Sequence, residues 1–401
     1  MPTSSIYDIY KLKGVQPIFS EIEDKVLYLH AKALKKHACC PKCRCKHSIR
    51  KGFKIRSFHL PPIGSTPCKL KLILPRLRCN NCHCIFWMKL PFMKGKSRFT
   101  PAFADYVLNL LQFGTIKHVA KFVRVGWDMV KNIHKCFLKN RYRKISLKKI
   151  RYISIDEINL KKGHTYMTVI TDIESGRVLY CNEGKDAKSI SRFLRKLSKN
   201  ARNLKAVSID MSRSYQFAVK KYLPHTMIVF DRFHVMAIIN KALDEVRKEE
   251  YTSQQYRCGR VMKGSRFLLL WNYEKLDVRK QERLSRLLQI NETLAKCYLF
   301  KEQFRMLWMR RSRKEAVHFL AVWLMDVLDS EIGPLKKAAR TILHHWEGIV
   351  SYFKYKISNG KAEGINNKIK TLKRQAYGYR DLEYFKLRLY HLHEQKYSLT
   401  G

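Results

Sequence analysis

The stretch "RYISIDEIN" (residues 151–159) decides the fold of the central part of the chain. A strand-like run, Tyr152 to Ile155, leads directly into two acids, Asp156 and Glu157. Acids are scarce here, because 81 Lys and Arg oppose only 32 Asp and Glu, for a formal charge of +49 over 401 residues. Successive residues of a strand point to opposite faces of a sheet, so the two acids cannot serve the same site.

The large positive charge predicts a polyanionic partner. An excess of this size favours nucleic acid, whose phosphates release counterions when a basic protein binds. A membrane surface is disfavoured, because the longest apolar runs, such as "HFLAVWLMDVL" (318–328), are too short to span a bilayer and the start of the chain has no signal-peptide core. We therefore expect a cytoplasmic protein.

The residues around the opening stretch alternate between strand and helix patterns. In chain order they are the strands "YISIDEI", "YMTVITDI" and "RVLYCNEG", the helix "DAKSISRFLRKLSK", the strand "LKAVSIDM", the helix "SRSYQFAVKKYL" and the strand "MIVFDRFH". This order predicts an α/β core with a ribonuclease H-like fold. The first and fourth strands of that fold are neighbours, so Asp156 and Asp210 are expected side by side.

Asp156 is the better partner for Asp210, because each follows an apolar strand. Two carboxylates held a few Å apart repel each other unless a cation lies between them. The simplest cation is Mg²⁺, which prefers oxygen ligands. The alternative is that both acids only form turns at strand ends, which is an ordinary use of Asp.

A third acid stands far away, in "SNGKAEGINNKIKTLKRQAYGYR" (358–380). Helical periodicity places Ile365, Ile369 and Leu372 inward, and a second stripe comprises Glu363, Asn367, Lys370 and Arg374. Glu363 is the only acid between residues 361 and 380. A carboxylate followed by an amide and two cations on one face suits a metal site that continues into a phosphate track.

The first hundred residues predict a zinc-binding domain. Two Cys-x-x-Cys pairs, Cys40 with Cys43 and Cys79 with Cys82, are separated by 35 residues, and no acid occurs between residues 25 and 104. Four thiolates satisfy tetrahedral Zn²⁺. Two alternatives stay open: the thiols could be unliganded, or one of the neighbouring cysteines, Cys39, Cys45 and Cys84, could substitute as a ligand.

Residues 101–137 predict a helix-turn-helix. "TIKHVAKFV" and "WDMVKNIHKCF" flank a turn at "RVG", with Val130 and Ile133 on the inner face of the second helix. That helix would offer Lys131, Asn132 and Lys135 to DNA. Arg124 stands where such turns often carry Gly, and a plain helical hairpin is the alternative.

Together these features resemble a DDE-type transposase of bacterial insertion sequences, of the ISL-three family. The blocks "IDE", "GHTYMTVITD", "IDMSRSY", "DRFHV" and "SNGKAEGINNKIKTLKRQAYGYR" follow one another as in that family, over nearly the whole chain. The resemblance implies that Asp156, Asp210 and Glu363 are the catalytic residues and the Mg²⁺ ligands. It also implies that Asp231 and His234 support the site, although a strand-end acid beside a buried His is an equal alternative.

The resemblance also implies an all-helical insertion within the core. The insertion contains Trp271, Trp308, Trp323 and Trp346, which are expected to be core residues, with stacking on bases at a transposon end as the alternative. The predicted domains are a zinc-binding DNA-recognition domain (1–98), a helix-turn-helix (99–137), a basic linker (138–151), the first part of the core (152–237), the helical insertion (238–350) and the C-terminal core helices with the catalytic Glu (351–401).

The implied function is cleavage of element ends and strand transfer into target DNA. Two Mg²⁺ ions, replaceable by Mn²⁺, would serve the chemistry, and one structural Zn²⁺ the finger. The partners would be double-stranded DNA, both terminal inverted repeats and target, and a second copy of the chain, on the bacterial nucleoid. A non-catalytic zinc-finger regulator derived from a transposase, and a structure-specific nuclease, are the rival readings.

Overall fold

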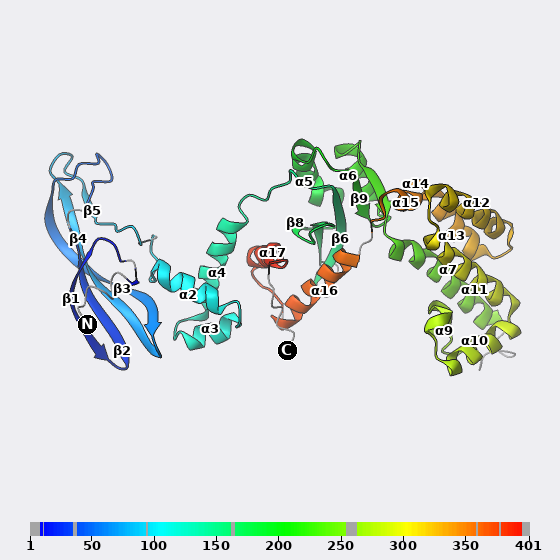
Figure 1. Cartoon of the computed structure of the whole chain (residues 1–401), viewed down its shortest axis with the longest axis horizontal. Helices are drawn as coiled ribbons and strands as arrows, with labels where there is room; N and C mark the ends of the chain where they lie inside the picture. Colours follow the sequence, from blue (N-terminus) through cyan, green and yellow to red (C-terminus); the bar gives the residue numbers. More distant parts are fainter. Residues whose placement is uncertain are drawn as a thin grey trace. The chain divides into compact units, whose positions relative to one another are not determined.

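The computed structural model describes residues 9–394, apart from residues 11, 35–37, 94, 162–164, 254–262, 358–359 and 377. The chain divides into two compact units, one that ends at Arg143 and one that runs from Lys144 to Glu394 (Figure 1). Within the described residues, no helix has the length and apolar character that crossing a membrane requires.

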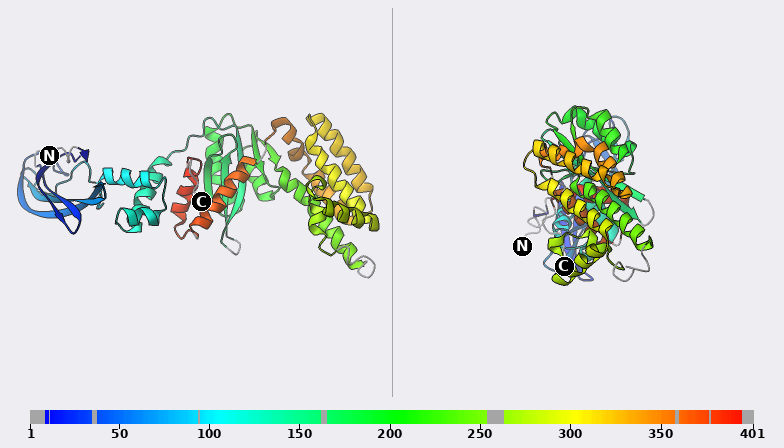
Figure 2. Two further views of the ribbon diagram at one scale, coloured as in Figure 1. Left: turned by 60° about the horizontal axis from the view of Figure 1, so that its bottom comes forward. Right: turned by 90° about the vertical axis from the view of Figure 1, so that its right-hand side faces the viewer.

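The first unit is built on a sheet. Its strands are β1 (Val15–Glu23), β2 (Val26–Ala33), β3 (Ser48–Ile63), β4 (Thr66–Cys79) and β5 (Ile85–Trp87), in the order β1-β2-β4-β3, with β5 paired to β4. On β4, Leu70, Leu72 and Leu74 are buried and pack with Leu29 and Phe58. This period of two is that of strands with one buried face, and the sheet is curved (Figure 2).

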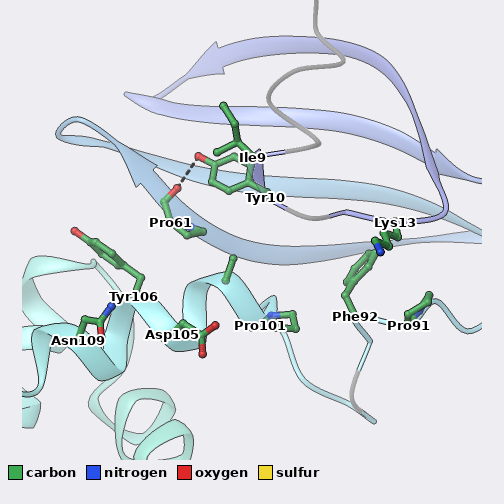
Figure 3. Close-up of a pocket in the computed structure, with 11 residues that line it drawn as sticks. Ile9, Tyr10, Lys13, Pro61, Pro91, Phe92, Pro101, Asp105, Tyr106 and Asn109 are labelled. Atoms are coloured by element: carbon green, nitrogen blue, oxygen red, sulfur yellow. Dashed lines mark hydrogen bonds between the residues drawn. The ribbon is translucent and has the colours of Figure 1, made fainter.

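A cavity of about 540 Å³ lies between this sheet and helix α2 (Pro101–Leu110). Its lining, drawn in Figure 3, is mainly apolar and includes Pro61, Phe92 and Tyr106. At its edge the Tyr10 hydroxyl donates to the carbonyl of Pro61 at 2.9 Å. The helix is tied to β3 by Thr100, which caps it and donates to the carbonyl of His59 at 3.2 Å.

Two further helices complete the predicted helix-turn-helix, α3 (Ile116–Phe122) and α4 (Trp127–Arg141). Val130 and Ile133 of α4 are buried, as predicted. The turn has Arg124 in the left-handed region at φ 52°, and the amide of Val125 donates to the carbonyl of Ala120 at 3.0 Å. This is a Schellman turn in the position where Gly is usual.

Helix α4 extends further than its predicted end, through Arg141. The charged segment that follows also contributes to the second unit, because Leu147 and Ile150 are buried in its core. Leu138, in the last turns of this helix, is fully buried.

The second unit contains a five-stranded mixed sheet. Its strands are β6 (Tyr152–Lys161), β7 (Thr165–Asp172), β8 (Val178–Glu183), β9 (Ala206–Ile209) and β10 (Met227–Phe230), in the order β10-β9-β6-β7-β8. β6, β7 and β8 are antiparallel neighbours, whereas β9 runs parallel to both β6 and β10. The predicted adjacency of the first and fourth strands of this sheet is therefore confirmed.

Helices cover both faces of this sheet (Figure 1). On one side, Ile153 and Ile155 share a core with α5 (Ala187–Asn200) and α6 (Arg213–Tyr222). On the other side, Ile158 shares a core with α16 (Gly360–Gln375) and α17 (Leu382–His391). Odd and even positions of β6 thus face different helices, as the strand period requires.

The regular elements that the structure describes between β10 and α16 are all helices. They are α7 (Arg232–Ser253), α9 (Arg266–Leu270), η2 (Tyr273–Lys275), α10 (Val278–Ile290), α11 (Glu292–Arg305), η3 (Met306–Met309), α12 (Arg313–Asp329), α13 (Gly333–His344), α14 (Trp346–Val350) and α15 (Tyr352–Tyr355). Trp308 and Trp323 are buried, as expected, but Trp271 is 48% exposed, so the core prediction is wrong for that residue.

Two strand predictions also need correction. The strand "MIVFDRFH" ends at Phe230, and α7 begins at Arg232, so His234 lies on a helix. Strand β6 does not end at its acids but continues to Lys161, because its other edge stays paired with β7 at both acids. The pairing of β6 with β9 ends just before Asp156, because Ser154 is the last residue of β6 that pairs with β9.

Candidate active site

The sheet brings Asp156 and Asp210 to the same level of two neighbouring strands. Ser154 of β6 pairs with Ser208 of β9 in a parallel register, and the two aspartates each follow two residues later. Asp210 stands directly after β9, at the carboxyl end of a parallel strand, where α/β sheets usually place their sites. Its Oδ1 accepts a hydrogen bond from the amide of Ser212 at 3.0 Å.

The electrostatics of this pair are those of crowded carboxylates. Burial raises the pKa of the Asp210 carboxyl, and the nearby charge of Asp156 raises it further. The amide of Ser212 and the imidazole of His234 act in the opposite direction. Asp210 is half-buried, and its carboxylate has a like-charged neighbour, so a cation bound between the two would stabilise the ionised forms.

Helix α16 contacts this pair through the side-chain amide of Asn366, which is not among the predicted site residues. Asn366 Nδ2 donates to Asp156 Oδ2 at 2.6 Å, while the other oxygen, Oδ1, accepts from the amide of Glu157 at 2.7 Å. Both oxygens of Asp156 are therefore oriented. The predicted stripe favoured Asn367, which is exposed; the two asparagines are adjacent, so helical periodicity alone could not select between them.

Glu363 lies one helical turn before Asn366 on α16, and it is exposed. Among the described residues, the three carboxylates of Asp156, Asp210 and Glu363 do not form a group whose oxygens all lie within 4.8 Å of one another. The predicted inward face of the same helix is confirmed, because Ile365, Ile369 and Leu372 are all buried. Lys370 and Arg374 are exposed, like Asn367.

Glu157 takes the opposite face of β6. The buried hydroxyl of Tyr215, on α6, donates to Glu157 Oε1 at 2.9 Å and lies 2.8 Å from Thr168 Oγ1. Burial raises the pKa of Glu157, and the hydrogen bond from Tyr215 partly offsets that rise. Glu157 thereby connects β6 to α6 through the hydroxyl of Tyr215, which also contacts Thr168 of β7.

Asp231 and His234 lie next to the aspartate pair. The amide of Asp231 donates to the carbonyl of Ile209 at 3.2 Å, directly before Asp210. His234 Nε2 is 3.9 Å from Asp231 Oδ2, and the imidazole lowers the pKa of Asp210. The residue directly before α7 thus adds a carboxylate, and the first turn of α7 adds an imidazole, near Asp210.

A separate cluster of four thiols lies in the first unit. Cys40 Sγ is 3.5 Å from Cys82 Sγ and Cys43 Sγ is 3.4 Å from Cys79 Sγ, and all four sulfurs lie within 4.8 Å of one another. The amide of Cys82 lowers the pKa of the Cys79 thiol to about 6, which favours the thiolate. This cluster is compatible with zinc.

The two halves of the thiol cluster have the same backbone geometry. The residue after the second cysteine of each pair is left-handed, Arg44 at φ 60° and His83 at φ 57°. The other nearby cysteines are not members of the cluster, and Cys39 Sγ instead lies 3.1 Å from the carbonyl of Arg44. The matching hydrogen bonds run from Cys40 N to Cys45 O and from Cys79 N to Cys84 O, both at 3.0 Å.

On α4, the residues predicted to meet DNA lie away from the buried stripe. Asn132 is exposed, and Lys131 and Lys135 are half-buried. The Lys131 ammonium lies 6.0 Å from the ring of Trp127, which is itself 58% exposed. The opposite stripe holds His134, a buried residue that is not among the predicted DNA contacts.

Comparisons with known proteins agree with these features. Residues 153–389 match the family model of an ISL3 transposase, and residues 88–135 match the helix-turn-helix domain of transposase family ISL3. The chain is 32% identical over 381 residues to the transposase for insertion sequence element IS1001 of Bordetella parapertussis, with 94% of each chain covered. It is 26% identical over 367 residues to the transposase for IS1557 of Mycobacterium tuberculosis H37Rv, covering 85% of this chain and 82% of that protein.

A solved structure, the Drosophila P element transposase strand transfer complex, gives a TM-score of 0.38 at 10% identity. It covers 74% of this chain and 92% of that one, a likeness too distant to bear on the fold. The family match, which spans the sheet, the helical segment and α16, is decisive: the chain belongs to the ISL3 family of transposases.

Proposed function

We propose that Asp156, Asp210 and Glu363 are the catalytic carboxylates of a DDE transposase on a ribonuclease H-like core. The observation that carries this proposal is the register of β6 and β9, which sets Asp156 level with Asp210, together with the hydrogen bond from α16 to Asp156. The strand order β10-β9-β6-β7-β8, with three antiparallel strands followed by two parallel ones, supports the ribonuclease H-like assignment.

The donor set fits Mg²⁺. All its members are hard oxygen ligands, and Asp210 has a raised pKa that a divalent cation beside it would reverse. Two such ions, when bound, would activate an attacking oxygen and stabilise a leaving oxygen of a phosphodiester. Glu363 is one turn from Asn366, so a small movement of the α16 side chains would bring its carboxylate toward the pair.

Other residues near the carboxylates would orient them or hold DNA. Asn366 orients Asp156, and Asp231, directly before α7, supports Asp210 together with His234 of the first turn of α7. Exposed Asn367, Lys370 and Arg374 continue along α16 and would hold DNA phosphates next to the carboxylates. The site would cleave the ends of the element with water and then transfer the released 3′-hydroxyl to target DNA.

The first unit would select the DNA. We propose that Cys40, Cys43, Cys79 and Cys82 hold one structural Zn²⁺, and that Lys131, Asn132 and Lys135 of α4 meet the terminal inverted repeats. Strand transfer joins two ends of one element, so two or more copies of the chain would assemble on DNA. This activity would place the protein on the bacterial nucleoid.

The test is a reconstituted reaction. Purified protein is incubated with labelled element ends, a target plasmid and Mg²⁺, and the products are separated into cut ends and joined ends. Joined products that disappear in Asp156→Asn, Asp210→Asn and Glu363→Gln would support the proposal. Cutting without joining would point to a nuclease, and neither product, together with selective end binding, would point to a regulator.

A further inference from the structure

The helical segment carries an exposed aromatic surface that the catalytic proposal does not use. Around the short helix α9, the side chains of Phe267, Trp271 and Tyr273 are 65%, 48% and 46% exposed. Elsewhere in the same segment, Trp308 and Trp323 are buried, as is usual for tryptophan inside a helical bundle. Three large aromatic rings at the surface within seven residues form a cluster, which we call the α9 aromatic surface.

Cations flank these rings. The guanidinium of Arg266 lies 5.9 Å from the centre of the Phe267 ring, and the ammonium of Lys280 lies 5.7 Å from that of the Trp271 ring. Residues 263–286 contain seven Lys and Arg against three Asp and Glu. Rings edged by net positive charge match a ligand that has flat apolar faces and negative charge.

A buried ammonium fixes the backbone of this surface. Lys301 of α11 is 1% exposed, and its Nζ donates to the carbonyl of Leu269 at 2.8 Å and to that of Trp271 at 2.9 Å. The carboxylate of Glu302 lies 2.7 Å from the same ammonium. A buried charge is costly unless it is paired and hydrogen-bonded, so this arrangement holds the backbone at Trp271 firmly in place.

We propose that the α9 aromatic surface binds unpaired DNA bases by stacking, with Trp271 as its main platform. In a duplex the faces of the bases are covered by their neighbours, so exposed rings can stack only on bases that have left the helix. Lys280 is paired with Asp277 at 2.6 Å and Arg266 with Asp244 at 3.5 Å, so it is the net positive charge of residues 263–286 that would attract the phosphates of the same strand. The proposal rests on the transposase function, because cutting and joining DNA ends produces unpaired strands, but it does not depend on which carboxylates are catalytic.

The experiment compares strands with and without bases. Binding of the full-length protein is measured by fluorescence anisotropy, without divalent metal, for an oligothymidine and for an abasic strand of equal length. Both strands carry the same phosphates, so their difference isolates stacking. One stacked base is worth about 1–3 kcal/mol, so Trp271→Ala should weaken oligothymidine binding by roughly 5- to 150-fold and leave abasic binding unchanged. Trp271→Phe keeps an aromatic ring and should therefore retain most of the affinity for oligothymidine that Trp271→Ala loses.

A matched control is Leu299→Ala, which removes a side chain that is 56% exposed on the neighbouring helix α11. This variant should bind oligothymidine like the parent protein. Thermal melting shows whether Trp271→Ala is folded. If it is not, the parent protein and Trp271→Phe still give the difference in affinity between the oligothymidine and the abasic strand. Equal affinity of the parent protein for the two strands would overturn the proposal, whereas loss of strand transfer alone would concern only the catalytic site.

Discussion

At the scale of single residues, the two acids of "SIDE" divide between two faces of one strand. Asp156 faces α16, where it accepts from Asn366, and Glu157 faces α6, where it accepts from Tyr215. The alternation of a strand predicts that they differ, and the apolar pattern around Asp210 favoured Asp156 as its partner. The role of Tyr215 could not be predicted, because nothing in the sequence places α6 over Glu157.

Neutralising the two acids should therefore have unequal effects. Asp156→Asn removes a proposed metal ligand, so cleavage and strand transfer should fall by several decades while DNA binding survives. Glu157→Gln keeps an acceptor for Tyr215 and should cost less than about 10-fold. Rates of end cleavage by both variants, measured with equal bound DNA, test this. Similar losses in the two variants would show that the strand face was assigned wrongly.

The two asparagines of α16 offer a second comparison. Asn366→Ala removes the hydrogen bond to Asp156, and loss of a residue that orients a metal ligand typically costs about 10–100-fold in activity or metal affinity. A higher Mg²⁺ concentration should restore part of the rate, which would distinguish positioning from a folding defect. Asn367→Ala, at the exposed neighbour, is the control and should leave the Mg²⁺ dependence unchanged. The same Mg²⁺ dependence in both variants would contradict this role for Asn366.

The Asp210 carboxyl should lower the stability of the folded chain at pH values at which it is ionised. Its pKa in the folded chain is raised above the ordinary 3.8, so the folded state loses stability as pH rises through that window. Asp210→Asn should therefore be inactive yet more stable near neutral pH in EDTA, by roughly 2–4 °C in Tm if the charge costs about 1 kcal/mol. The gain should shrink as pH falls toward the ordinary pKa. Melting curves at several pH values measure it, and an equal gain at all pH values would contradict the electrostatic cause.

At the scale of elements, the thiol cluster joins two turns of identical design. Cys40, Cys43, Cys79 and Cys82 were predicted from their paired spacing alone, but the exclusion of Cys39, Cys45 and Cys84 required the backbone geometry. Both turns need a left-handed residue, and here Arg44 and His83 accept that conformation. Sequence spacing identifies which thiols share one turn, whereas the way two turns meet depends on the pairing of β3 with β4.

Cys79→Ser should greatly reduce bound zinc, because it removes one of four thiols that converge within 4.8 Å. Metal analysis of the purified chain should give about one zinc per chain before the change, and the first unit should lose stability with the metal. Cys39→Ser is the matched control and should keep its zinc, since the Cys39 thiol lies against the carbonyls of Cys40 and Arg44 and outside the cluster. Zinc loss in both variants would mean that the ligand set is wrong.

The turn of the helix-turn-helix contains an unfavourable residue. Arg124 occupies a left-handed position that Gly adopts freely, and it is exposed, so Arg124→Gly should stabilise the first unit by about 1 kcal/mol. The same change removes a cation from the turn before α4, so DNA affinity should fall as stability rises. Chemical unfolding and DNA titration of the one variant measure both effects. Unchanged stability would show that the strain is absorbed elsewhere in the turn.

At the scale of the whole molecule, the positive charge is not concentrated in the unit that we propose to read the DNA sequence. Residues 1–143 contain 29 Lys and Arg against six Asp and Glu, whereas the rest of the chain contains 52 against 26. The net charges of the two units are therefore similar, although the first unit is much shorter. Composition predicted a DNA-binding protein, but it could not show which unit reads sequence, because phosphate contacts carry no sequence information.

This distribution leads to a prediction about the separated second unit. Full-length protein should bind element ends with an affinity that falls by decades between roughly 50 and 200 mM salt, if six or more phosphates are contacted. A chain that begins at Lys144 keeps half of the net charge, so it should retain salt-sensitive binding to any DNA, but it should lose its preference for the terminal repeats together with the thiol cluster and α4. Competition with unrelated duplex at several salt concentrations separates the two effects, and circular dichroism checks that the shortened chain is folded. If the shortened chain still preferred element ends, sequence recognition would have to lie in the second unit, with the helical segment from α7 to α15 as the first region to test.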